Sequence, residues 1–93
     1  MYFVYIILSQ KSQRFYIGQT SDLKKRLQQH NCPESTYLTR SGQPWVLYFS
    51  IECQTIKQAM RVERHIKEMK SRRYIENLTK YPDMVAKLLE KYR

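Results

Sequence analysis

The chain of 93 residues contains only two cysteines, two glycines and three prolines. Cys32 and Cys53 have neither the paired spacing of a zinc site nor the repeated pattern of a disulfide framework, so both are expected to be reduced thiols without a chemical role. No run rich in glycine, serine or proline forms a linker, and no segment repeats. These absences predict one compact domain, because a chain of this length can build only a single modest core.

Long apolar segments are absent as well. The apolar run from Met1 to Leu8 is too short to span a bilayer. It also lacks the basic leader and small-residue cleavage site of a signal peptide. A cytoplasmic location is therefore the default expectation.

Acidic residues are scarce, with 8 Asp and Glu against 17 Lys and Arg, so the formal net charge is +9. This excess on a short chain favours polyanionic partners, nucleic acid above all. Charge alone leaves open a merely solubilising surface or an acidic membrane surface. The candidate nucleic-acid contacts are Lys24, Lys25, Arg64, Lys67, Lys70, Arg72 and Arg73.

The first twenty residues have the pattern of a β-hairpin. Residues 2–8 are mostly aromatic and β-branched, which predicts a buried strand, and residues 15–18 predict a second one. The polar residues 9–14 between them form the expected turn. If the loop holds an even number of residues, Tyr5 and Tyr16 point to the same face of the sheet.

A first helix is expected to follow this hairpin. Ser21 offers a capping hydroxyl, and Asp22 places an acid in the first turn. Residues 31–44 predict a loop, either a substrate-contacting flap or a mobile segment, and residues 45–51 a third strand. The residues that share one side of this first helix are Leu23, Arg26, Leu27 and His30.

The C-terminal part of the chain is predicted to be helical. Thr55 and Gln58 have the spacing of a capping box at the start of a helix. Residues 71–78 predict a short helix, and Pro82 opens a last amphipathic one. The expected apolar face of the helix after Thr55 consists of Ile56, Ala59, Met60, Val62, Ile66 and Met69. The inward residues of the last helix are Met84, Val85, Leu88, Leu89 and Tyr92.

The order of these elements is β-β-α-β followed by helices. It predicts an α+β domain with a three-stranded, mostly antiparallel sheet flanked by helices. A single domain would span residues 1–93, with its core over about residues 1–78 and a C-terminal amphipathic helix over about residues 82–92.

Glu63 interrupts the predicted apolar helix face. A buried carboxylate is costly unless it is paired or bound to a cation. One explanation is an ion pair with Lys67, one turn further along, or with Arg26 from elsewhere in the chain. The other is a metal site, since Mg²⁺ often binds one or two carboxylates together with water and substrate phosphate.

Other residues of the chain could act beside such a metal. Each of Tyr5, Tyr16, Arg26 and His30 has an ordinary structural explanation when it is considered alone. Together with Glu63 they suit phosphodiester hydrolysis, in which water loses a proton and the charge on the phosphate is neutralised. A tyrosine hydroxyl can relay protons, and an arginine can bind phosphate through two hydrogen bonds.

The arrangement of these residues resembles the GIY-YIG nucleases. Phe3-Val4-Tyr5 and Tyr16-Ile17-Gly18, ten residues apart, are similar to the paired tripeptides of that family, although Phe3 replaces a glycine. Residues 19–31, which include Arg26 and His30, and residues 59–67, which include Glu63, resemble its later segments. The resemblance covers about residues 1–78. It is closest to short stand-alone members, and to the N-terminal incision domain of the bacterial excision-repair nuclease.

This resemblance implies a mechanism. Glu63 would hold one Mg²⁺ or Mn²⁺ ion, Tyr5 would be the first choice for general base, and Tyr16 would orient water or phosphate. Arg26 would stabilise the transition state, and His30 would contact phosphate or assist proton transfer. The remaining implied positions are Gly18, which would let the substrate backbone approach the sheet, and Asn77, the candidate for a downstream asparagine.

The leading hypothesis is thus a metal-dependent endonuclease that acts on DNA, with DNA repair as its context. The alternatives are a basic nucleic-acid-binding module with this fold but little or no cleavage, and a domain that docks on an acidic protein. The resemblance favours DNA over RNA, and no membrane partner is expected. The form of the substrate and the oligomeric state stay open.

Overall fold

The computed structural model describes residues 1–34 and 40–93. Strands β1 (Tyr2–Ser9) and β2 (Phe15–Thr20) form an antiparallel hairpin, and β3 (Trp45–Cys53) pairs antiparallel with the other edge of β1. The sheet order is therefore β2-β1-β3. The predicted three-stranded sheet is confirmed, and all of its pairs are antiparallel.

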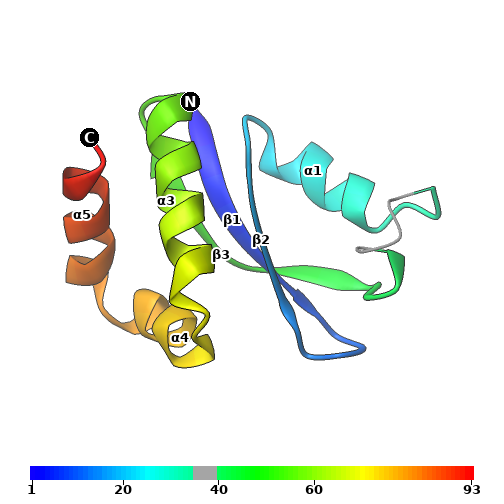
Figure 1. Ribbon diagram of the computed structural model, residues 1–93. Helices are drawn as coiled ribbons and strands as arrows, with labels where there is room; N and C mark the ends of the chain where they lie inside the picture. Colours follow the sequence, from blue (N-terminus) through cyan, green and yellow to red (C-terminus); the bar gives the residue numbers. More distant parts are fainter. Residues whose placement is uncertain (35–39) are drawn as a thin grey trace.

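The helices cover both faces of this sheet. Helix α1 (Leu23–His30) lies on one side, while α3 (Ile56–Met69), α4 (Arg72–Lys80) and α5 (Pro82–Lys91) lie on the other (Figure 1). The predicted α+β class is confirmed. Within the described ranges, no helix is both long and apolar enough to cross a membrane.

The register of the hairpin places the two candidate tyrosines on one face. Tyr5 pairs with Gly18, and Ile7 pairs with Tyr16. The pairing of Leu8 with Phe15 leaves an even number of residues in the connection, as the prediction required. Because side chains alternate along a strand, Tyr5, Ile7 and Tyr16 project to the same side, toward α1.

An irregularity in β3 adds a third aromatic residue to that face. Ile6 pairs with Phe49 whereas Ile7 pairs with Leu47, so Tyr48 is an extra residue in the strand. A shift of one residue reverses which side chains face which side of the sheet. Beyond Tyr48, Trp45 consequently lies on the face of Tyr5 and Ile7.

Each face of the sheet has its own buried cluster. The larger one lies under α3, α4 and α5, and the smaller one lies under α1. The larger cluster comprises Val4, Ile6, Ile51, Cys53, Ala59, Val62, Ile66, Ile75, Leu78 and Leu88. The smaller cluster consists of Tyr5, Ile7 and Trp45, with Tyr16, Leu23 and Leu27 packed against it. The candidate site is thus built into the smaller core.

The helix starts follow their capping residues, with one correction. Asp22 caps α1 by accepting a hydrogen bond from the Lys25 backbone N–H, so Asp22 rather than Ser21 is the cap. The Thr55 hydroxyl caps α3 as predicted. The Gln58 side chain accepts a hydrogen bond from the Gln54 N–H through Oε1. It also donates through Nε2 to the Leu89 carbonyl, which connects α5 to the start of α3.

The apolar face of α3 is narrower than predicted. Ala59, Val62 and Ile66 are buried, but the Met60 residue is 56% exposed. Ile56 and Met69 are likewise exposed. Glu63, whose side chain is 20% exposed, therefore lies at the margin of the buried face and not inside it.

Candidate active site

The centre of the candidate site is the hydroxyl group of Tyr5. The tyrosine residue is only 3% exposed. Its hydroxyl lies 2.8 Å from His30 Nε2 and accepts a hydrogen bond from Arg26 Nε at 3.2 Å. Arg26 and His30 are four residues apart, so one turn of α1 brings both to the same phenol oxygen. The structure therefore joins three of the predicted site residues.

Two amide side chains that the sequence analysis missed hold the end of α1. The Asn31 amide accepts from the Trp45 N–H at 2.7 Å and donates to the Trp45 carbonyl at 3.0 Å. Gln43 Nε2 donates to the His30 carbonyl at 2.8 Å. These bonds attach His30 to the start of β3. The sequence signal that could have predicted this attachment is Asn31, which directly follows the last residue of the helix, His30.

The protonation states around Tyr5 follow from burial. Burial lowers the pKa of His30 to about 4, and the neighbouring Arg26 charge acts in the same direction. The imidazole is therefore neutral near pH 7. Because Arg26 can only donate, and neutral His30 can accept at Nε2, the Tyr5 hydroxyl proton is directed toward His30. The pKa of Arg26 is raised, mainly by its hydrogen bond to Tyr5.

This buried histidine should make the fold sensitive to acid. The folded pKa of about 4 lies below the unfolded value of 6.5, so the unfolded chain binds more protons between these pH values. The contribution of neutral His30 to the free energy of unfolding is complete above pH 6.5. It is lost as the pH falls toward 4, by up to about 3 kcal/mol. Urea unfolding across this range should show the loss in wild type and a smaller loss in His30→Gln. Equal pH dependence of the two proteins would contradict the assignment.

Tyr16 borders the same site in a more exposed position. Its ring packs edge-on to His30 with the ring centroids 5.0 Å apart, and it stacks on Tyr5 at 6.5 Å. Trp45 covers its other side at 6.1 Å. Among the residues that the structure describes, none forms a hydrogen bond with the Tyr16 hydroxyl. The Tyr16 oxygen thus lacks the partners that the Tyr5 oxygen has among these residues.

Gly18 lies directly against the Tyr5 ring. A Cβ atom added to Gly18 would lie 2.4 Å from the Tyr5 oxygen and 2.6 Å from Cζ. The phenol ring of Tyr5 thus occupies the space beside the glycine, which explains the need for a glycine here by packing alone. The glycine is required because only a residue without Cβ lets the ring lie across β2.

Glu63 lies at the margin of the buried face of α3. Its Oε2 atom accepts from Lys67 Nζ at 2.6 Å, which is the pairing that the sequence left open, and Lys67 rather than Arg26 is the partner. Burial raises the pKa of Tyr5, the Arg26 interactions oppose this change, and the charges of Tyr16 and Glu63 add to it. The carboxylate is therefore close enough to influence Tyr5 electrostatically.

A surface groove of about 410 Å³ leads to Arg26. Its walls come from the end of β2, from α1 and from the start of α3. Ile56 lines the groove, and Glu63 lies seven residues further along α3, two turns on the same flank. Other lining residues are Tyr2, Gln19, Lys25 and Gln29, and Gln29 accepts a hydrogen bond from Arg26 Nη1 at 3.1 Å.

The other predicted contacts are distributed unevenly. Lys24, Lys70 and Arg73 are exposed, whereas Arg64 pairs with Glu68 at 3.0 Å. Arg72 has a structural role, since it donates to the Gln13 carbonyl at 2.6 Å and lies 4.6 Å from the Phe15 ring centroid, which ties α4 to the hairpin. Asn77 lies on α4, and none of the described contacts joins its side chain to Tyr5 or Glu63.

The architecture and the residues that converge on Tyr5 match a known family. The family model described as the GIY-YIG catalytic domain matches residues 1–77. The chain belongs to the GIY-YIG family. Membership of this family supports a nuclease-type function on nucleic acid. The sheet, with α1 on one face and α3 on the other, forms the GIY-YIG domain of this protein.

Two curated bacterial proteins are similar to this GIY-YIG chain. The UPF0213 protein YazA of Bacillus subtilis is 32% identical over 78 residues, which cover 81% of this chain and 78% of YazA. A UPF0213 protein of Bacillus licheniformis is 31% identical over 75 residues, 77% of each chain. No solved structure matches the chain.

The part of the chain that the structure describes contains no group of three or more His, Cys, Asp or Glu side chains arranged to hold a metal ion. A metal bound by a single carboxylate would take its other ligands from water and substrate oxygens. Such sparse protein ligation suits Mg²⁺, which keeps several waters and binds substrate phosphates.

Proposed function

We propose that the protein is a metal-dependent endonuclease that hydrolyses phosphodiester bonds in DNA. The observation that carries this proposal is the convergence of Arg26 and His30 on the Tyr5 hydroxyl, with the Tyr16 ring packed against His30 and Tyr5. Packing alone would not require a buried tyrosine whose hydroxyl is hydrogen-bonded to both an arginine and a neutral histidine. The choice of DNA over RNA rests on the family resemblance.

Arg26 is suited to bind the scissile phosphate. One of its five N–H groups is used by Tyr5 and another by Gln29, so three remain to face the groove. A guanidinium that its neighbours already orient loses little freedom on binding and can donate two hydrogen bonds to phosphate. In this role it would stabilise the charge that develops in the transition state.

The geometry favours Tyr16 rather than Tyr5 as the residue that receives the proton from water. Tyr5 is buried, its pKa is raised and its proton is directed toward His30, so its oxygen is poorly placed to reach water. Tyr16 is more exposed, and its hydroxyl forms no hydrogen bond with any residue that the structure describes. Tyr5 would then position Arg26 and His30.

Glu63 would hold the divalent metal, Mg²⁺ or Mn²⁺. The carboxylate is partly exposed on the flank of α3 that carries Ile56, and its present partner Lys67 has a side chain that is 50% exposed and can move away. When bound, such an ion neutralises charge on the phosphate and on the leaving oxygen.

The alternative is a nucleic-acid-binding module that keeps the fold but does not cleave. Its supporting observation is the positive charge of the chain, which binding alone would explain. The hydrogen-bonded group around Tyr5 argues for the nuclease, since contact with phosphate does not require a buried phenol.

Cleavage assays test the proposal directly. Purified protein should cut supercoiled, linear or branched DNA in Mg²⁺ or Mn²⁺ and should not cut in excess chelator. Tyr16→Phe removes the proposed proton acceptor and should reduce the rate about 10²-fold or more, the range of general-base catalysis. Tyr5→Phe keeps the ring and serves as the comparison.

Cleavage that persists in chelator would contradict the metal requirement. Tight, salt-sensitive DNA binding without cleavage of any substrate would favour the binding module instead. A rate loss confined to Tyr5→Phe would return the role of general base to Tyr5.

A further inference from the structure

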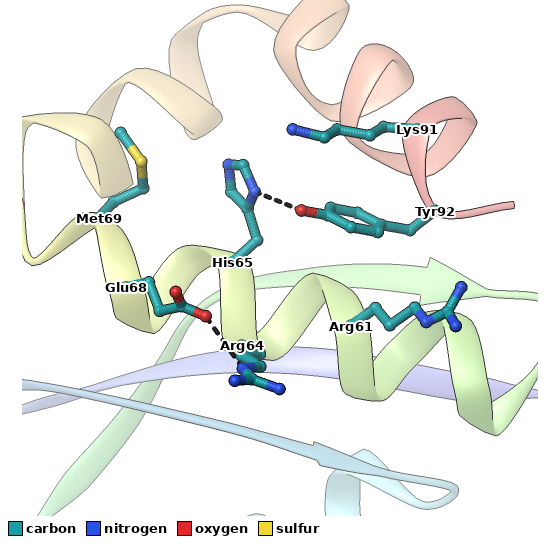
Figure 2. Close-up of a pocket in the computed structure, with 7 residues that line it drawn as sticks. All are labelled: Arg61, Arg64, His65, Glu68, Met69, Lys91 and Tyr92. Carbon is teal, nitrogen blue, oxygen red and sulfur yellow. Dashed lines mark hydrogen bonds and ion pairs between the residues drawn. The ribbon is translucent and has the colours of Figure 1, made fainter.

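A second surface hollow lies between α3 and α5, away from the candidate active site. Its volume is about 610 Å³. Figure 2 shows side chains from both helices directed into this α3–α5 cleft. The residues that line it are Arg61, Arg64, His65, Glu68, Met69, Lys91 and Tyr92.

The charge of the α3–α5 cleft is mainly positive. Within the described residues, Arg61 and Lys91 have no carboxylate partner. The single acid, Glu68, is paired with Arg64 at 3.0 Å, and both side chains are largely exposed. Exposed pairs of this kind are weak, so Arg64 can exchange this partner for another anion. The cleft therefore offers two unpaired cations and a third that can be recruited.

Contacts across the cleft hold its two walls together. The His65 Nδ1 atom lies 2.8 Å from the Tyr92 hydroxyl, which joins α3 to the residue that follows α5 (Figure 2). The two rings pack at 5.6 Å, and Lys91 Nζ lies 5.5 Å from the Tyr92 ring centroid. The cations are thus carried on helices that are fixed relative to one another.

Helix α3 separates the cleft from the candidate active site. Glu63 and His65 are two residues apart, which corresponds to about 200° around a helix, so they project from opposite flanks. The Glu63 charge contributes to raising the pKa of Tyr5, whereas His65 contacts Tyr92. A ligand that reaches both sites must therefore cross the outer side of α3, where Arg61 and Arg64 are exposed.

We propose that the α3–α5 cleft binds the phosphate backbone of a second nucleic-acid segment while the first occupies the candidate active site. The inference rests on the proposed function for the identity of the ligand. Charge complementarity supports it, because Arg61 and Lys91 present unpaired cations and arginine is suited to phosphate. Met69 and Tyr92 also line the cleft, but Arg61, Arg64 and Lys91 give it the charge that suits a polyanion.

Two nucleic-acid segments that lie on opposite flanks of α3 must diverge from each other, as the arms of a branched or sharply bent nucleic acid do. A short duplex can occupy one site at a time, whereas a branched molecule can occupy both. Binding both sites with one molecule raises affinity because the second contact becomes intramolecular. Branched DNA is accordingly the favoured substrate class.

The test compares two double variants that change the net charge equally. Arg61→Glu with Lys91→Glu alters the cleft, while Lys11→Glu with Lys80→Glu alters exposed lysines outside it. Binding to a branched DNA and to a short duplex is measured in chelator, which prevents cleavage, after circular dichroism has confirmed folding. The cleft variant should bind branched DNA about tenfold more weakly than the control, and its salt slope should fall by about 2. Binding of the short duplex to the active-site face should remain.

The other outcomes separate this inference from the proposed function. Equal affinities of the two double variants for branched DNA would overturn the cleft assignment, even if the wild type cleaves. A cleft variant that loses binding to a polyglutamate peptide but not to DNA would assign the cleft to an acidic protein and overturn the proposal as well. Cleft-dependent binding without any metal-dependent cleavage would reject only the nuclease. Failure of the wild type to bind any nucleic acid would reject both.

Discussion

Glu63→Gln is expected to reduce metal-dependent cleavage at least about 10³-fold, which corresponds to about 4 kcal/mol of transition-state stabilisation. Glutamine keeps the size of the side chain but removes the negative charge that a hard cation requires. Stability should change little, because Glu63 lies at the margin of the core with its partner Lys67 half exposed. Initial rates in Mg²⁺ and in Mn²⁺, together with urea unfolding, measure the two effects.

Lys67→Gln is the matched control for this substitution. It breaks the same ion pair from the other side but leaves the carboxylate in place. Cleavage should persist in this variant, and the metal concentration for half-maximal rate should not rise, because Lys67 no longer competes for Glu63. If Lys67→Gln loses as much activity as Glu63→Gln, the ion pair and not the carboxylate is what matters, and the metal assignment is wrong.

Gly18→Ala is expected to disrupt the site although it adds only one methyl group. The new carbon would overlap the Tyr5 oxygen and Cζ, at 2.4 and 2.6 Å, so the rigid ring must move away from Arg26 and His30. Overpacking of this kind costs about 1–3 kcal/mol, and a lost buried hydrogen bond adds to it. Urea unfolding and cleavage assays should show losses in both stability and rate.

A double-mutant cycle with Tyr5→Ala isolates the cause. Truncation of the ring leaves space beside Gly18, so Gly18→Ala should cost little in the Tyr5→Ala background although Tyr5→Ala is itself destabilising. The coupling free energy should be at least about 1 kcal/mol. If Gly18→Ala destabilises both backgrounds equally, its effect acts through the backbone and not through Tyr5.

The strands, the helices and the α+β class could be predicted because they depend on local patterns. Residues 2–8 are apolar and β-branched or aromatic, which specifies a strand wherever it packs. The spacing of Arg26 and His30 placed both on one side of a helix, as observed. The even hairpin loop was sufficient to put Tyr5 and Tyr16 on one face.

Other features depended on partners far away in the chain. The width of the buried face of α3 was overestimated, since Ile56, Met60 and Met69 are apolar but remain 47%, 56% and 44% exposed. The role of Gly18 became visible only when the Tyr5 ring was seen across it. Arg72 was predicted from the sequence to contact phosphate, yet its guanidinium group is bound to the hairpin through the Gln13 carbonyl and the Phe15 ring.

The sequence by itself thus determined the elements, their order and the identity of the residues that converge on Tyr5. Hydrophobic periodicity and capping act over a few residues, and the chain contains that information locally. Tertiary structure alone decided that Trp45 joins the Tyr5 face and that the Tyr5 proton faces His30. It also decided that α3 separates the α3–α5 cleft from the candidate active site. A one-residue bulge at Tyr48 and the burial of His30 arise from packing between distant segments, which no local pattern encodes.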